Sequence, residues 1–555
     1  MTLLDSESFA ELWSNKWRLV LWAAVVYLSY KVVYAKFLSH TARVPGALID
    51  KICGIRWFVS GLTGQKMYFV DRQVRTYGTL VEVAPNKLAC ASSDAVKTIY
   101  GSHEWKKSHF YSDFADFNGT PSLFSETDPI RATMLRRCFL PAFSRANLVA
   151  MSKNIFMHLE KFISKLEEFE RQGRPLDTYR WFRYLTFEVV TDIGFGAEYD
   201  MISHGEIDHP FVNDFDDSVA WGILKSFLGP VIERIPVSWF PRSIREWQLA
   251  EVRTERHARG GLDKWREQKD QGIAGHRVDI LQRLVEHGEK NAEDRLTEKE
   301  LVTEIMEIMY EPAQNSSDTT VILTHFTRLA GGDTTASTVT YACYELTRFP
   351  EVQRKLRQAL RDAIPDTSVP ITVETLEAIP YLDWTVKEML RMHPTLPSSL
   401  ERVVPANGAE IAGHQLKGGT IVCMQAFTQH RQEAIFPNPE EFEPERREMF
   451  LCPNNENLKI HFADAVSQSR WAVNATAIMK ANLLAFSSGV RSCVGQNLAT
   501  MQMKIHMGMI LRKYRIEGHP DTNPHSMEPL DFFQGKPRAG KSNGYTLDVT
   551  VQWRY

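Results

Sequence analysis

The chain has 555 residues, of which 43% are hydrophobic and 24% are charged, proportions that are typical of globular proteins. Its formal net charge of -3 gives no support for a nucleic-acid-binding protein, so we expect no nucleic acid among its partners. Seven cysteines are scattered without paired spacing, which argues against a disulfide framework and suits a reducing compartment.

One strongly apolar run lies near the N-terminus, over residues 19–35 (LVLWAAVVYLSYKVVYA). It is slightly shorter than the roughly 20 residues that span a bilayer. However, Trp17, Trp22 and Tyr34 suit the membrane–water interface, and Lys31 can extend its charge toward water. No small-x-small cleavage site follows the run, so we expect a retained transmembrane anchor rather than a signal peptide.

Basic residues follow this apolar run at Lys36, Arg43, Lys51 and Arg56. The positive-inside rule then places the main domain in the cytosol and residues 1–18 on the lumenal side. We expect residues 36–46 to form a hinge and residues 47–555 to form the globular domain.

The first elements predicted beyond the hinge are short. Residues 80–83 and 87–91 are separated by Ala84-Pro85-Asn86 and predict a β-hairpin. The aromatic stretch 101–124 is irregular, and residues 131–143 predict a helix. Long amphipathic helices are expected over residues 147–302.

Two helical patterns are separated by a segment that does not suit a helix. Residues 296–309 (LTEKELVTEIMEIM) are amphipathic, and residues 330–335 (AGGDTT) open a helix that runs to about Phe349. Between them, residues 310–328 (YEPAQNSSDTTVILTHFTR) contain Pro312 and an Asn-Ser-Ser run, which should end a helix.

Further along the chain, residues 381–392 predict a helix ended by Pro394, with Glu388 and Arg391 on one face at i, i+3. Two strands are predicted at 410–412 and 420–424. We expect these two strands to form one small sheet.

The most specific pattern in the chain is residues 486–499 (FSSGVRSCVGQNLA). Gly489 and Gly495 lack a Cβ, so the loop can turn tightly and lie flat against a planar cofactor. Loop amides and the N-terminal end of the helix from about Gln496 favour a thiolate at Cys493. A sulfur so placed can serve as an axial haem ligand that promotes O–O cleavage.

Residues 486–495 match the pattern F-x-x-G-x-R-x-C-x-G at every position, and from about Pro45 onward the chain resembles the cytochrome P450 family. The resemblance implies a mainly α fold with a small β region. It also implies haem b, buried between a long central helix and the cysteine loop, with Cys493 as the metal ligand.

The resemblance assigns further residues to the haem. Phe486 and Gly489 belong to the ligand loop, and three guanidinium groups are expected at the propionates: Arg136, Arg402 and Arg491. Ala132 stands where the family usually has Trp or His, so we expect one propionate contact to be missing.

Two more sets of residues take their roles from the resemblance. Asp333 and Thr334 match the acid and alcohol that relay protons to dioxygen. Glu388 and Arg391 match a pair that binds Arg446 of the P-E-R motif in a buried ion network behind the haem loop.

The implied activity is that of a haem-thiolate monooxygenase of the fungal microsomal type. It would take electrons from a separate NADPH-cytochrome P450 reductase and oxidise a hydrophobic small molecule of secondary metabolism. It would be anchored once in the endoplasmic reticulum membrane with its catalytic domain in the cytosol. Two alternatives are a haem-thiolate isomerase or dehydratase that does not activate dioxygen, and a non-catalytic product of a mis-spliced gene model.

The second alternative rests on two atypical insertions, residues 310–328 and 447–470. Removing the first restores M-L-A-G-G-D-T-T in one helix, and removing the second gives P-E-R-W. The codons for Met309-Tyr310-Glu311 must read ATG TAY GAR, which contains GTAYGA, a fungal-type intron start. The codon for Arg328 can supply the closing AG of an intron in the same phase. We therefore hypothesise that 310–328 is a translated intron. For 447–470 the residues do not define a splice phase, so this is the weaker case and a surface insertion is the alternative.

Overall fold

The computed structural model describes residues 6–115, 119–197, 199–205, 221, 224, 232, 234–272, 278–309, 332–365, 369–446, 477–520, 522–532, 534–538 and 550–554. Both predicted insertions, 310–328 and 447–470, lie outside these residues.

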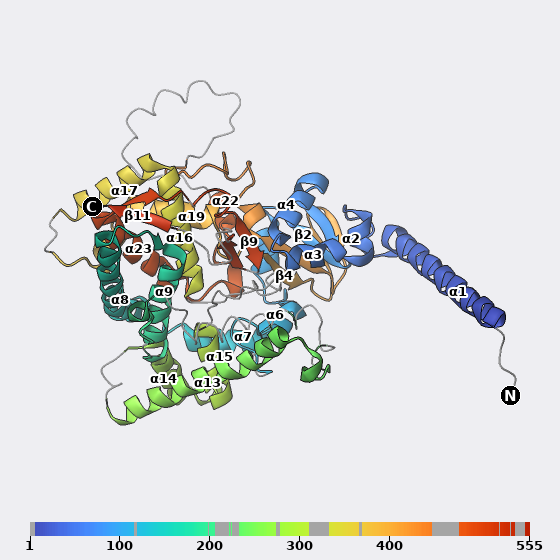
Figure 1. Cartoon of the computed structure of the whole chain (residues 1–555), viewed down its shortest axis with the longest axis horizontal. Helices are drawn as coiled ribbons and strands as arrows, with labels where there is room; N and C mark the ends of the chain where they lie inside the picture. Colours follow the sequence, from blue (N-terminus) through green and yellow to red (C-terminus); the bar gives the residue numbers. More distant parts are fainter. Residues whose placement is uncertain are drawn as a thin grey trace, which may run out of the picture.

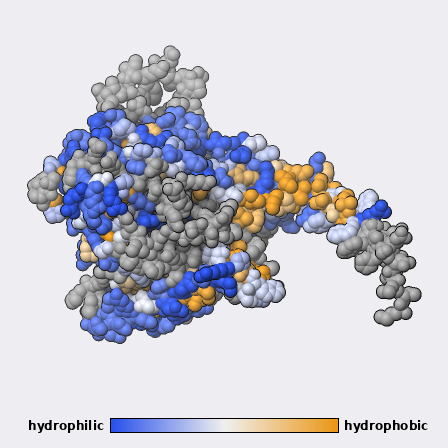
Figure 2. Space-filling model, in the orientation of Figure 1, coloured by the Kyte–Doolittle hydropathy of each residue, from blue (hydrophilic) through white to orange (hydrophobic). Residues whose placement is uncertain are grey.

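The N-terminal helix α1 (Ser6–Val33) continues into a π-helical turn, η1 (Tyr34–Leu38), and projects away from the rest of the molecule (Figure 1). Residues 17–38 have a mean hydropathy of 1.4 and are only 6% buried, so they are long and apolar enough to cross a membrane. Figure 2 shows this apolar surface along the projecting helix. The helix begins before the predicted run and extends into the predicted hinge.

The body of the molecule is mainly helical, as predicted, with several small sheets, the largest of which lies toward the end that carries α1 (Figure 1). Its longer helices are α4 (Lys66–Tyr77), α7 (Pro129–Phe139), α8 (Arg145–Arg171), α9 (Thr178–Phe195), α13 (Arg242–Asp270), α14 (Ile280–Lys290), α15 (Glu298–Met309), α16 (Asp333–Arg348), α17 (Pro350–Ala363), α19 (Pro380–Met392) and α23 (Gln496–Lys513). The shorter helices and turns are α2 (Leu48–Cys53), α3 (Ile55–Leu62), α5 (Ala95–Tyr100), α6 (His109–Ala115), α10 (Met201–His204), η2 (Val237–Trp239), η4 (Ala292–Asp294), α18 (Val373–Glu377), α20 (Ala426–Gln429), α22 (Ala477–Asn482) and η7 (Gly489–Arg491).

The main core lies where α8, α9, α16 and α23 pack together. Phe162, Phe182, Tyr341 and Met503 are among the buried side chains that these four helices contribute. Burying a side chain of this size stabilises the fold by about 1.5–3 kcal/mol. The core therefore fixes α16 and α23, the helices that open at Asp333 and just after Cys493.

Helix α7 has well-defined ends. The Asp128 carboxylate accepts the N–H groups of Ile130 and Arg131, and Pro129 occupies the first turn, where no hydrogen-bond donor is needed. The helix ends at Phe139 and not at Phe143 as predicted, because Pro141 cannot continue it. By contrast, α16 and α19 have nearly the predicted bounds.

The largest sheet has the order β1-β2-β7-β4 and contains β1 (Leu80–Ala84), β2 (Lys87–Cys90), β7 (Ile421–Gln425) and β4 (Ser399–Val403). The predicted hairpin is confirmed, since β1 and β2 are antiparallel, while β2 and β7 run parallel. The three-stranded sheet contains β3 (Leu176–Asp177), β11 (Thr550–Arg554) and β8 (Arg515–Gly518), and β9 (Pro529–Phe532) pairs with β10 (Gln534–Pro537).

The prediction that 410–412 and 420–424 share a sheet is wrong. The first strand, β5 (Ala409–Ile411), folds back onto β6 (His414–Leu416), because Ala412 and Gly413 form a tight turn with positive φ angles. The second, β7, is largely buried between β2 and β4. Its pairing partners are therefore distant in sequence.

Candidate functional site

Cys493 lies between the turn η7 and helix α23, and its N–H donates to the Phe486 carbonyl at 3.0 Å. The side chain forms part of the wall of an internal cavity, so its exposed surface faces that cavity. Burial raises the pKa of the thiol, whereas hydrogen bonds from the Gly495 and Gln496 amides and the charge of Arg136 act in the opposite direction. The loop thus supplies the amides that were predicted to favour a thiolate.

The two loop glycines differ in whether the structure leaves room for a side chain. Gly489 has a φ of +65°, and a Cβ there would lie 2.0 Å from the Tyr100 carbonyl oxygen. Gly495 has a φ of -82°, and a Cβ there would meet Phe143 and Cys493 only at ordinary contact distances. The chain therefore requires glycine at 489 because the loop packs against the end of α5.

The cavity beside Cys493 is mostly apolar and lies between α7, α15, α16, β4 and the cysteine loop. Its apolar lining includes Ala132, Phe139, Phe143, Ile308, Leu396, Leu400, Phe486 and Leu498. A largely apolar cavity with a few polar groups suits a planar cofactor and a hydrophobic ligand. The aromatic stretch 101–124 also reaches the wall, through Tyr111, Leu123 and Phe124.

The three predicted arginines, Arg136, Arg402 and Arg491, all reach this cavity. Arg136 donates to the Ser492 carbonyl at 2.5 Å, and Arg402 donates to the Glu401 carbonyl at 2.8 Å. Arg491 donates to the Glu126 carbonyl at 2.7 Å and the Leu123 carbonyl at 3.3 Å.

None of the three guanidinium groups forms an ion pair with a carboxylate of the described residues. Burial, together with the charge of Arg402, lowers the pKa of Arg491 to about 10. Several buried guanidinium groups repel one another, and without nearby anions their burial is unfavourable. Two carboxylates of a bound group would relieve that cost, so the arginines fit the propionates of haem b.

Two polar neighbours of these arginines were not predicted. Lys107 lines the cavity, donates to the Phe124 carbonyl and lies 4.4 Å from the centres of both the Tyr111 and Phe124 rings. The Tyr111 hydroxyl lies 3.5 Å from Arg402. An isolated β-bridge brings Lys107 beside Arg402, and the local sequence around Lys107 gave no signal for this position.

Asp333 and Thr334 face different surroundings. Thr334 lines the cavity, while Asp333 is fully buried and lies 3.1 Å from the Arg183 guanidinium of α9. The Tyr179 hydroxyl donates to the Asp333 carboxylate at 3.3 Å. The alcohol therefore meets the cavity directly, and the acid is held on the side of α9.

The residues of the predicted ion network do lie together. Glu388 accepts from Arg391 at 2.8 and 2.9 Å and from Arg446 at 2.8 Å. All three side chains are at most 1% exposed. Arg391 and Arg446 also donate to loop carbonyls, including that of Glu441. The network thus fixes α19 against the loop before residue 447.

His430 connects this network to the cysteine loop and was missed by sequence reasoning. Its Nδ1–H donates to the Arg391 carbonyl at 2.8 Å, and its Nε2 accepts the Leu484 N–H at 2.7 Å. Burial lowers the pKa of His430 to about 3, so the ring is neutral and can fill both roles. Leu484 lies two residues before Phe486, so the contact positions the start of the loop.

The chain belongs to the cytochrome P450 family, whose profile matches residues 86–326 and 313–540. It is 27% identical to benzoate 4-monooxygenase bphA of Aspergillus niger, over 93% of this chain and 94% of that protein. It is 25% identical to cytochrome P450 monooxygenase lcsI of Purpureocillium lilacinum, over 89% and 87% of the two chains. It is also 25% identical to cytochrome P450 monooxygenase BipB of Cochliobolus sativus, over 94% of each chain.

The protein is therefore a cytochrome P450 monooxygenase, and the cofactor of this family is haem b held by a cysteine thiolate. The apolar cavity, the cysteine on its wall and the three arginines without carboxylate partners fit that group.

Proposed function

We propose that this protein is a membrane-anchored monooxygenase that oxidises a hydrophobic small molecule of fungal secondary metabolism. The observation that carries the proposal is the cavity that brings Cys493 together with Arg136, Arg402 and Arg491. In this proposal Cys493 is the axial ligand and the arginines bind the two propionates. Phe486 packs beside the ligand and Gly489 shapes its loop.

Haem held at Cys493 would supply reductive activation of dioxygen and transfer of one oxygen atom to a C–H bond of the substrate. Thr334 is placed to donate a proton into the cavity from its wall. Asp333 is the proposed proton source for Thr334. The Asp333 carboxylate lies 3.1 Å from the Arg183 guanidinium, so this contact would have to open before Asp333 could turn toward Thr334.

The substrate proposal rests on the cavity wall. Leu123, Phe124, Leu396 and Leu400 present apolar surface, while Glu304 is 2% exposed on the same wall. A buried carboxylate disfavours an anionic substrate next to it. We therefore expect a neutral, apolar compound, and benzoate is the informative comparison because a relative is a benzoate 4-monooxygenase.

Electrons are proposed to come from NADPH-cytochrome P450 reductase in the endoplasmic reticulum membrane. Residues 19–35, within the apolar helix of residues 17–38, would anchor the chain once in that membrane, with residues 1–18 lumenal and the haem domain cytosolic. Near the anchor, α2 and α3 expose Leu48, Ile49, Ile55 and Val59, each at least 43% accessible, which supports contact of this end with lipid.

Residues 310–328 are proposed to be absent from the working enzyme, and residues 447–470 are either a second such segment or a surface insertion. In support, the family profile matches in two pieces whose ends overlap at 313–326, inside the first insertion. Sequencing cDNA across both junctions tests this directly. A transcript that retains residues 310–328 as the sole species would disprove the intron hypothesis.

The activity is tested with the chain as written and with a form that lacks 310–328 and 447–470, each expressed in yeast membranes. The reduced, carbon-monoxide-bound difference spectrum should show the thiolate-ligated haem band in at least one form, and Cys493→Ser should abolish it. NADPH consumption with added reductase and an apolar substrate should follow. If only the shortened form shows the band, the chain as written is a non-catalytic product of a mis-spliced gene model.

A thiolate band without substrate-dependent NADPH and dioxygen consumption would contradict the proposed electron supply.

The role of Thr334 in proton delivery is tested by comparing two variants, Thr334→Ser and Thr334→Val. Serine keeps the hydroxyl and should retain coupled turnover. Valine keeps the shape and should divert NADPH toward peroxide or water. Equal coupling in the two variants would remove Thr334 from the proton path.

A further inference from the structure

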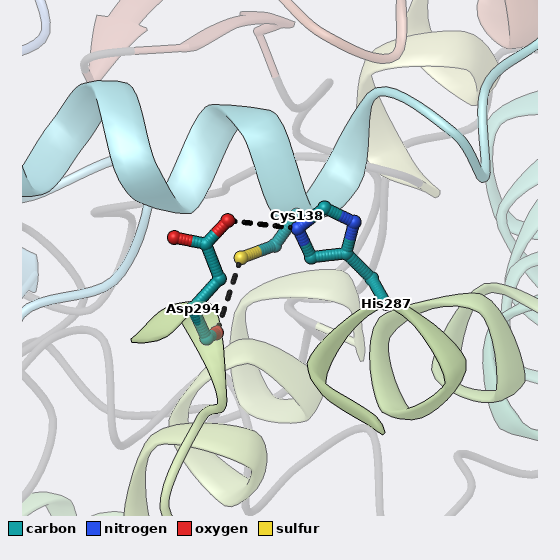
Figure 3. Close-up of side chains that lie close together, drawn as sticks. All are labelled: Cys138, His287 and Asp294. Atoms are coloured by element: carbon teal, nitrogen blue, oxygen red, sulfur yellow. Dashed lines mark hydrogen bonds and ion pairs between the residues drawn. The ribbon is translucent and has the colours of Figure 1, made fainter. Parts of the chain in front are cut away.

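A second cluster of metal-binding side chain types lies away from the Cys493 cavity. It consists of Cys138 on α7, His287 on α14 and Asp294 in η4 (Figure 3). One ligand atom from each residue lies within 4.8 Å of the others. The three residues come from separate elements that pack against one another, so the tertiary fold assembles the cluster.

The side chains point toward a common centre. The His287 Nε2 lies 2.9 Å from the Asp294 Oδ2, and the Cys138 Sγ lies 3.5 Å from the Asp294 carbonyl oxygen (Figure 3). Cys138 is 1% exposed and Asp294 2% exposed, while the His287 side chain remains 13% exposed. The sulfur and carboxylate are thus enclosed, and the imidazole provides the route to solvent.

The local packing brings these residues close for identifiable reasons. A Cβ at Gly288 would lie 3.1 Å from the Arg295 Cα, so glycine beside His287 lets α14 approach the segment that carries Asp294. The Met134 thioether lies 3.5 Å from the Cys138 sulfur, one turn earlier on α7. It adds a polarisable group to the wall beside the cluster.

Arg137 is the competitor for the carboxylate. Its Nε donates to the Asp294 Oδ2 at 2.7 Å, and its second nitrogen donates to Oδ1. The Arg137 side chain is 58% exposed, so it can turn into solvent when another cation takes its place.

We propose that Cys138, His287 and Asp294 bind a zinc ion. Sulfur, imidazole nitrogen and carboxylate oxygen are the three ligand types that Zn²⁺ takes in proteins, and a water would complete the tetrahedron. Zn²⁺ replaces the proton of the Cys138 thiol, which is released to solvent, and its charge replaces that of Arg137 beside Asp294. No redox step is involved.

The site would tie α7 to α14 and η4. Arg136, two residues before Cys138 on α7, donates to the Ser492 carbonyl beside Cys493. A metal that holds α7 in place would therefore hold one wall of the Cys493 cavity, without taking part in the chemistry there. The proposed role is structural, and it does not depend on the identity of the substrate.

The experiment uses whichever of the two forms, the chain as written or the form lacking 310–328 and 447–470, retains haem. The protein is dialysed first against Zn²⁺ and then against a weak chelator. Zinc and iron are measured together by mass spectrometry, and the Zn K-edge absorption spectrum reports the ligand atoms. We expect about one zinc per haem iron and one Zn–S distance of about 2.3 Å. Added zinc should also raise the thermal midpoint of the wild-type chain.

Cys138→Ser and His287→Gln should each weaken zinc binding at least tenfold and remove the thermal shift. His287→Gln keeps a donor toward Asp294, so it decides the matter if Cys138→Ser fails to fold. Cys53→Ser is the matched control, because Cys53 is an exposed thiol outside the cluster, and it should bind zinc normally. Absence of zinc from the wild type, a spectrum without sulfur, or unchanged binding in both ligand variants would overturn the proposal.

Discussion

Replacing Glu388 with glutamine tests whether the buried ion network holds the fold together. The Glu388 carboxylate accepts hydrogen bonds from Arg391 and Arg446, and all three side chains are at most 1% exposed. Glutamine keeps the size of the side chain and removes its charge. Both buried guanidinium groups would therefore lose the carboxylate that they share.

Breaking a buried ion pair by removing one partner costs about 3–5 kcal/mol of unfolding free energy. Whole domains are stable by only about 5–15 kcal/mol, so this loss is large. Burial alone would raise the pKa of Glu388, but the charges of Arg391 and Arg446 outweigh it and hold the pKa below its ordinary value. The stabilisation is therefore complete above about pH 4.5 and is lost as the pH falls through the lower folded pKa.

The matched control is Glu445→Gln in the same P-E-R motif. Glu445 pairs with Lys355 at the surface, where both side chains are more than a third exposed, so its loss should cost at most about 1 kcal/mol. Urea unfolding followed by circular dichroism at pH 7, on the haem-retaining form, measures both changes. If Glu388→Gln and Glu445→Gln shift the unfolding midpoint equally, the network does not stabilise the fold as argued. Arg446→Lys, which keeps the charge but loses the paired donors, should fall between them.

Three other predictions concern the loop, a buried histidine and the propionate site. Gly489→Ala should lower the free energy of unfolding by more than about 2 kcal/mol, because residue 489 has a left-handed backbone and a Cβ there would clash with Tyr100. Gly495→Ala should lower it far less. Equal losses of the two variants in urea unfolding would contradict this prediction. Burial lowers the pKa of His506 to about 3, so the ring takes up a proton when the chain unfolds at mildly acidic pH. This should lower the free energy of unfolding by about 2 kcal/mol between pH 7 and pH 5. His506→Leu should make the free energy of unfolding depend less steeply on pH in this range, and an unchanged dependence would refute the prediction. Arg491→Met should stabilise the haem-free chain by about 3 kcal/mol and yet accelerate haem loss to apomyoglobin, whereas a slower loss would disprove its role at the propionates.

Much of the candidate site could be predicted because its signals are local. The spacing from Phe486 to Gly495 specifies a turn, a thiol and a helix start in ten residues, and the structure has η7 and α23 on either side of Cys493. The i, i+3 spacing likewise put Glu388 and Arg391 on one face of α19. Other residues carried no such signal. His430 was missed because a single histidine in a loop has no sequence pattern that links it to Leu484.

By itself, the sequence determined where many helices begin and end, the apolar N-terminal helix, the cysteine loop and, through resemblance, the family. These features depend on neighbouring residues, whose spacing directly limits the backbone and the contacts within one element. Only the tertiary structure decided which distant groups meet. It brought Arg136 to Ser492, 356 residues away in the chain, placed Arg183 against Asp333, and assembled Cys138 with His287 and Asp294. Such contacts follow from how whole helices bury their apolar faces, a sum over many side chains that no local pattern records.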